Sequence, residues 1–159
     1  MRANRGRRTF FARVWFAKRG GENAFAGDVQ TMEAQMHQIL LTNNETAIRA
    51  FPGKSIPVEG DSRAVLRAVR DRVHTGWKLL THPLAASIKM LHSPVVSVLM
   101  EEGTGAPDAE SLARIESDIL TLDTVLGQRD FDHRNKDAYQ FVDWNRMQSA
   151  LNELNRQKG

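Results

Sequence analysis

The sequence predicts an α/β domain: a small, mostly parallel sheet with helices on both faces, in a Rossmann-like three-layer arrangement preceded by a basic N-terminal extension. Two observations predict it. From residue 36 onward, short apolar runs alternate with longer segments whose apolar residues recur every three or four positions, as in alternating strands and helices. The chain has 159 residues, 41% hydrophobic and 26% charged, which suits one globular domain. We therefore expect a single domain over residues 36–157.

The first expected elements are two strands with a short helix between them. The continuous apolar run of residues 39–41 is typical of a strand buried on both faces, and the Thr-Asn-Asn sequence after it favours a turn and a helix cap. A short helix over residues 45–51 ends at a Pro-Gly pair. Residues 55–59 form the next strand, which we place at the periphery because Pro57 has no N–H to donate to a neighbouring strand.

A longer amphipathic helix follows, capped by Asp61 or Ser62 and stopped by Gly76. Its apolar residues lie on one face and its arginines on the rest. Residues 77–80 then form a short strand. The run from Val95 to Met100 is apolar except for one serine, which predicts a central strand covered on both faces.

The C-terminal part is expected to contain two helices and one more strand. Asp108 caps a long helix with apolar residues at 3, 4, 3, 4 spacing, closed by Gly127. A polar insertion over residues 128–137 follows. Residues 139–142 are then expected to form a short strand, and a final helix is expected to begin at Asp143.

Basic residues are concentrated at the N-terminus. Residues 1–31 contain seven basic and two acidic side chains, a net charge of +5, whereas the other 128 residues contain 15 basic and 17 acidic ones. The predicted domain therefore lacks the positive charge of a nucleic-acid-binding module, and we expect no specific nucleic-acid partner. No apolar run approaches the roughly 18 residues that cross a bilayer, so we expect no membrane span and a cytoplasmic location.

Residues 1–31 also combine their arginines with several phenylalanines and a tryptophan. Three interpretations stay open. The segment is a basic amphipathic helix that touches anionic lipid or RNA, a disordered extension, or a stretch upstream of a true start at Met32 or Met36. The low specificity of aromatic and basic composition favours the last two.

Composition and motifs exclude several kinds of chemistry. The chain has no cysteine, which excludes disulfides, thiolate nucleophiles and iron-sulfur ligation. Its histidines do not pair with a carboxylate at a known metal-ligand spacing, and neither a G-x-G-x-x-G nor a Walker glycine loop is present. We therefore expect no metal, no cofactor and no direct redox chemistry.

Polar side chains leave the predicted strands at their carboxyl ends, where open α/β sheets bind ligands. Among them are a histidine, which exchanges a proton near neutral pH, and a lysine, which binds anions. The expected ligand- or partner-binding residues are Asn43, Asn44, Thr81, His82, Ser87 and Lys89. Plainer roles stay open as well, since the asparagines suit turns and caps and the histidine could stabilise its loop. The two-residue separation of Ser87 and Lys89 disfavours a Ser-x-x-Lys hydrolase.

Several of these motifs resemble the GrdX family, from about Met36 to Leu154. The most specific element is Thr81-His82-Pro83-Leu84 followed by Ser87 and Lys89 at matching spacing. The sequence departs from the family pattern at residues 90–93, where a polar, proline-bearing continuation is expected. The other matching residues are Leu41-Thr42-Asn43-Asn44, Arg70-Asp71, His74 and Gly76.

Members of the GrdX family are encoded among the genes for glycine, sarcosine and betaine reductases of amino-acid-fermenting bacteria. The resemblance implies an accessory protein of such a reductase system that contacts a subunit of the large complex. The residues themselves leave a second hypothesis open: a small metabolite-binding module or enzyme that acts on a phosphate or carboxylate ligand at the strand ends. No catalytic residue can be assigned from the sequence, and the accessory role is the one we favour.

Overall fold

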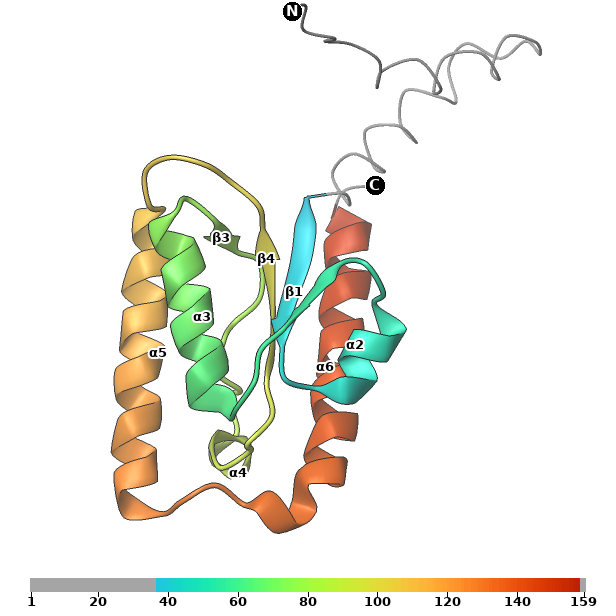
Figure 1. Cartoon of the computed structure of the whole chain (residues 1–159), viewed down its shortest axis with the longest axis vertical. Coiled ribbons are helices and arrows are strands. Elements are labelled where there is room, and N and C mark those ends of the chain that lie inside the picture. The colour runs from blue at the N-terminus through green and yellow to red at the C-terminus, as the bar shows by residue number, and fades with distance from the viewer. Residues whose placement is uncertain (1–36, 158–159) are drawn as a thin grey trace, which may run out of the picture.

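The computed structural model describes residues 37–157 as a four-stranded sheet with helices on both faces (Figure 1). The expectations for residues 1–31 lie outside the described residues. In chain order the elements are β1 (Gln38–Thr42), α2 (Glu45–Ala50), β2 (Ser55–Pro57), α3 (Ser62–His74), β3 (Lys78–Leu79), α4 (Ile88–Leu91), β4 (Ser97–Glu101), α5 (Ala109–Gln128), the 3-10 turn η1 (His133–Asn135) and α6 (Lys136–Gln157).

The sheet is mixed, with the strand order β2-β1-β4-β3. Strand β1 pairs in parallel with β2, but β4 runs antiparallel to both β1 and β3. The expected α/β class with helices on both faces is therefore confirmed, but the sheet is mixed, with two of its three strand pairs antiparallel, instead of the expected mostly parallel, Rossmann-like one. A parallel connection needs a long crossover, usually a helix, whereas only the four-residue α4 lies between β3 and β4, and the chain turns back at the same sheet edge.

The expected strand over residues 139–142 is also wrong, because this stretch belongs to the long helix α6. Tyr139, Phe141 and Val142 are residue types that favour strands, but that preference is weak and depends on context. The residues of α6 that turn towards the sheet continue a helical spacing, from Asp143 to Met147 and on to Leu151. Asp143 is consequently a buried residue in the middle of α6, whereas the sequence predicts that the helix begins there.

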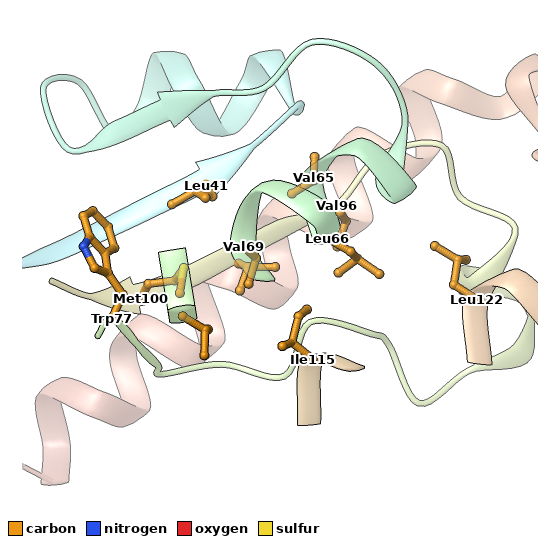
Figure 2. Close-up of a cluster of buried hydrophobic side chains, with 11 residues drawn as sticks. Leu41, Val65, Leu66, Val69, Trp77, Val96, Met100, Ile115 and Leu122 are labelled. Carbon is orange, nitrogen blue, oxygen red and sulfur yellow. The ribbon is translucent and has the colours of Figure 1, made fainter. Parts of the chain in front are cut away.

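One face of the sheet packs on α3 and α5 through a continuous apolar cluster (Figure 2). Val65, Leu66, Val69 and Val73 supply the stripe of α3, as the helical spacing predicts, and Ile115 is fully buried on α5. Strand β4 lies between β1 and β3, and its residues contribute to clusters on both faces. The expectation of a central, doubly covered strand is therefore confirmed.

The opposite face packs on α2 and α6 and has a smaller fully buried apolar cluster. That cluster consists of Leu40, Ala47, Leu99 and Met147, with Phe51, Leu80, Trp144, Leu151 and Leu154 partly buried around it. The two helices on this face differ greatly in length, since α2 has six residues and α6 has 22. Figure 1 shows α2 beside only part of α6.

The predicted starts of α2, α3 and α5 agree with the structure, whereas Gly127 lies inside α5 instead of closing it. The side chains of Asn44, Asp61 and Asp108 accept hydrogen bonds from backbone N–H groups in the first turns of α2, α3 and α5. After α3, Gly76 has φ +99°, and a Cβ there would lie 2.8 Å from the backbone carbon of Thr104. Only glycine fits this turn without strain, because it alone adopts the left-handed conformation without a steric clash.

Candidate functional site

The carboxyl ends of β1, β2 and β3 lie at one edge of the sheet, which is also where β4 begins. The sequence-predicted residues follow two of these strands. Asn43 and Asn44 leave β1, while Thr81, His82, Ser87 and Lys89 lie on the segment that leaves β3. The strand-end edge is therefore where the sequence places it, but its side chains differ in what they contact.

The side chain of Asn43 links three loops by hydrogen bonds. Its Nδ2 donates to the carbonyl of Gly60, after β2, at 2.9 Å and to the carbonyl of Pro94, before β4, at 2.7 Å. Its Oδ1 accepts from the N–H of Val96 at 2.9 Å. Both hydrogens of Nδ2 and one acceptor site of Oδ1 are used inside the protein, so Asn43 chiefly organises the edge.

Asn44 joins β1 to α2 and α6. It is fully buried, its Oδ1 accepts from the N–H of Thr46 at 3.0 Å, and its Nδ2 donates to the carbonyl of Gln140 at 2.9 Å. The same Nδ2 donates to Oδ2 of Asp143, also at 2.9 Å. The cap role that the sequence left open is therefore present, together with a second role in holding α6.

Asp143 is a buried carboxylate that the sequence analysis missed as a site residue. It is 1% exposed, its Oδ1 accepts from the N–H of Ser97 at 3.0 Å, and its Oδ2 accepts from Oγ of Ser97 at 2.5 Å. Arg146 contacts Oδ1 at 3.4 Å and donates to the carbonyl of Ser97 at 3.3 Å. Buried carboxylates need such partners because the unpaired charge would be costly. This arrangement fastens α6 to β4.

Thr42 extends that polar cluster into the sheet. Its Oγ1 lies 2.7 Å from Oγ of Ser97 and accepts from the N–H of Asn44 at 2.9 Å. Asp143, Asn44, Ser97, Thr42 and Arg146 together form what we call the Asp143 network. The only sequence signal for it was the presence of Thr42 and Ser97 in mostly apolar strands, because the members on α6 lie far away in the chain.

The Thr81-His82-Pro83-Leu84 segment is tied to its surroundings at each position. Oγ1 of Thr81 accepts from the N–H of Leu99 at 3.0 Å, which extends the pairing of β3 with β4. Pro83 is buried, and Leu84 packs on the apolar cluster of the α3 and α5 face. His82 is exposed, and its Nδ1 lies 3.0 Å from the guanidinium of Arg114 on α5.

Asp118 lies near this segment on α5. Partial burial raises the pKa of its carboxyl above the ordinary value of 3.8, while the charges of Arg114 and His82 and the N–H of Leu84 act in the opposite direction. Its Oδ2 has no hydrogen-bond partner among residues 37–157. Two basic side chains, those of His82 and Arg114, thus lie near the partly desolvated carboxyl of Asp118. None of these three residues is a nucleophile of the serine or cysteine type.

Ser87 directly precedes α4, and Lys89 lies within it. Both side chains are exposed. Ser87 precedes the helix but makes no side-chain capping bond, and Lys89 takes part in no ion pair within residues 37–157. No hydrogen bond or ion pair in this described range joins the side chains of any two of the six predicted residues. All six residues lie at the strand-end edge, but their side chains do not form one connected site.

Two further features bear on the kind of site. Within residues 37–157, no three histidine or acidic side chains are grouped so that they could hold a metal ion. None of the helices in this range is long and apolar enough to span a bilayer.

Comparison with known families identifies a relationship. The sequence model described as GrdX-like protein matches residues 39–152, from β1 into α6. No curated protein and no solved structure matches the chain. The matched range contains the sheet, the strand-end edge and the Asp143 network, and it covers well over half of the sequence. The chain therefore belongs to the GrdX-like family.

Proposed function

We propose that this chain is a non-catalytic accessory protein of a glycine, sarcosine or betaine reductase system and that it acts by contact with a protein of that system. The family name supports the link to glycine reductase. The observation that carries the mode of action is the exposure of large apolar side chains near the strand-end edge. Of the polar side chains there, those of Asn43, Asn44 and Thr81 are hydrogen-bonded within the fold.

The proposed contact surface consists of Ser87, Ile88, Lys89, Phe141 and Val142, and we call it the strand-end surface. Ile88 is 75% exposed and Phe141 is 66% exposed. Both α4 and the start of α6 lie at the end of the molecule where β1 finishes (Figure 1). Exposed apolar groups of this size gathered near one edge favour protein contact, because burying them against a partner removes apolar surface from water.

Residues from α4 and α6 also meet directly beneath this surface. Met90 and Leu91 line a cavity of about 10 Å³ together with Asp143 and Arg146. The Asp143 network thus fixes α6 at the place where α4 approaches it. This support gives the strand-end surface a defined shape, which a specific protein contact requires.

Lys89 sets the chemistry expected of the partner. It is exposed beside Ile88 and is available for a carboxylate of another protein. We therefore expect the partner to present an apolar patch next to an acidic segment. A charge at the rim of an interface chiefly affects the association rate and its salt dependence, whereas the apolar centre supplies more of the affinity.

The test is surface plasmon resonance between this protein and purified subunits of a glycine reductase. Ile88→Asp and Lys89→Glu are each expected to weaken binding at least tenfold, and Lys89→Glu should also reduce the salt dependence of association. Arg67→Glu is the matched control, because Arg67 is an exposed cation on α3, away from the surface. Parental binding by both surface variants, or loss of binding by the control, would contradict the proposal.

The contact of His82 with Arg114 favours a second candidate, the binding of a small phosphate or carboxylate ligand at the strand ends. The groove of about 670 Å³ beside β3 contains both residues and Lys78. It also contains Glu101, Asp108, Glu110 and Glu153. Since these carboxylates repel an anion, such a ligand would be confined to the His82 end. Thermal shifts with phosphate and acetate, lost in Arg114→Ala, would support this candidate over protein contact.

A further inference from the structure

A second groove lies on the α2 and α6 face, away from the strand-end surface. At 1.5 Å per residue, α2 is about 9 Å long and α6 about 33 Å, so α2 covers only part of the seam between α6 and the sheet. A cavity of about 590 Å³ occupies this place, within the usual range of small-ligand pockets. We call it the α2–α6 groove.

Gln38 is part of the groove lining and is the feature that most needs a partner. It is only 4% exposed, and its Nε2 has no hydrogen-bond partner in the part of the chain that the structure describes. A buried amide donor without an acceptor is rare in folded proteins, because the lost hydration is not replaced. A ligand in the groove with a carbonyl or ring-nitrogen acceptor would satisfy this group.

The apolar lining includes two aromatic side chains. Trp144 on α6 and Phe51 after α2 both line the groove, with Leu151. All three are partly buried and pack on the apolar cluster of this face, which holds them in place. Aromatic faces held in this way bind flat rings by stacking.

The remaining lining is rich in amides. Asn145, Gln148 and Asn152 lie on successive turns of α6, and their side chains line the groove. Each amide has both a donor and an acceptor, which matches a ligand edge that alternates the two. Among residues 37–157, no acidic residue lines the groove, and Lys54 is the only charged residue of this range in the lining. The lining therefore favours an uncharged ligand over a metal ion or a polyamine.

We propose that the α2–α6 groove binds a neutral heterocycle of the nucleobase type. Such a ring has flat faces for Trp144 and Phe51, mixed donors and acceptors for the amides, and an acceptor for Nε2 of Gln38. Asparagine and glutamine pair with base edges in the same way in nucleic-acid complexes. This site is separate from the proposed protein contact, since Gln38 begins β1 and the strand-end residues follow its other end.

The test is isothermal titration calorimetry of the full chain with adenosine, guanosine, cytidine and uridine, and with glucose as a non-planar polar probe. At least one nucleoside is expected to bind and glucose is not. Gln38→Leu is expected to weaken nucleoside binding about tenfold or more while raising the Tm, because it removes the unpartnered amide. Gln128→Leu, an exposed amide change at the end of α5, is the matched control and should leave binding unchanged.

Three outcomes would overturn this assignment. The first is that none of the nucleosides binds at millimolar concentration. The second is that glucose binds in preference to the nucleosides. The third is that Gln38→Leu keeps its fold, as judged by circular dichroism, and binds nucleosides with unchanged affinity. Binding of the reductase subunits by Gln38→Leu should equal that of the parent. A failed nucleoside titration would therefore not contradict the proposed accessory function. Likewise, a failure to bind reductase subunits would not contradict the ligand site in the α2–α6 groove.

Discussion

The two faces of the sheet are held in different ways. On the α3 and α5 face, a continuous cluster of fully buried apolar side chains joins both helices to the strands. On the α2 and α6 face, the fully buried apolar cluster is small, and the Asp143 network crosses between α6, β1 and β4. Apolar packing depends mainly on volume, whereas a buried polar network depends on the exact pairing of donors and acceptors. The two faces should therefore respond differently to substitution.

The largest effect is expected from Asp143→Ala. The change leaves the N–H and Oγ of Ser97 and Nδ2 of Asn44 without their buried acceptor. Removal of one member of a buried charged network commonly costs about 3 to 5 kcal/mol, and we expect about 4 kcal/mol in the free energy of unfolding, measured by urea denaturation. Asp137→Ala, at an exposed position in the first turn of α6, should change it little.

The isosteric variant Asp143→Asn sharpens the comparison. It preserves the shape of the side chain but replaces one acceptor oxygen by a donor that faces other donors. We expect it to retain a cost of about 2 kcal/mol or more. Stability equal to that of the parent would show that the network holds α6 by shape alone and would remove the distinction between the two faces.

On the opposite face, Leu66→Ala is expected to lower the free energy of unfolding by about 3 kcal/mol. Leu66 is fully buried in the apolar cluster, and the loss combines its transfer free energy with the cavity that remains. Leu66→Met, which nearly conserves volume, should cost less than about 1.5 kcal/mol. A large cost for this conservative variant, in the same denaturation experiment, would mean that the apolar face is as specific as the polar one.

The same contrast explains what the sequence predicted and what it missed. The stripe from Val65 to Val73, the caps at Asn44 and Asp61 and the edge strand with Pro57 are local patterns, and the structure agrees with each. The direction of β4 and the burial of Asp143 depend on contacts between distant parts of the chain, so no local pattern contains them.

The candidate site shows the same limit. The sequence placed Asn43 and Thr81 at the strand ends, because the alternation of elements fixes where strands stop. It did not reveal that Asn43 bonds to the carbonyls of Gly60 and Pro94. Nor could it show that Nε2 of Gln38 is buried without a partner, since the lack of a partner is a property of the packed fold.

A smaller effect is expected at Asp118, a partly buried carboxyl on the α3 and α5 face. Burial raises its pKa above 3.8. The folded state therefore holds the proton more tightly than the unfolded state, and the stability from this group is lost as pH rises from 3.8 through the folded pKa. Asp118→Asn should raise the Tm near neutral pH, and its advantage should disappear below pH 3.8.

The thermal melts that test Asp118→Asn need a control for the charge change itself. Asp137→Asn removes a carboxylate from an exposed site, so its Tm should differ little from that of the parent across the same pH range. A lower Tm for Asp118→Asn near neutral pH would show that the contacts of Asp118 with Arg114 and the N–H of Leu84 outweigh the cost of its burial.

The smallest effect is expected from deletion of residues 1–31. Among the described residues, members of both apolar clusters and of the Asp143 network start at position 39 and continue into α6. Residues 1–31 carry a net charge of +5, unlike the rest of the chain, and their aromatic residues show no stripe that matches either face. The shortened protein should therefore keep its circular dichroism spectrum and its Tm. Aggregation, or a Tm many degrees lower, would show that Phe11, Trp15 or Phe16 packs on the domain and that the two faces alone do not account for its stability.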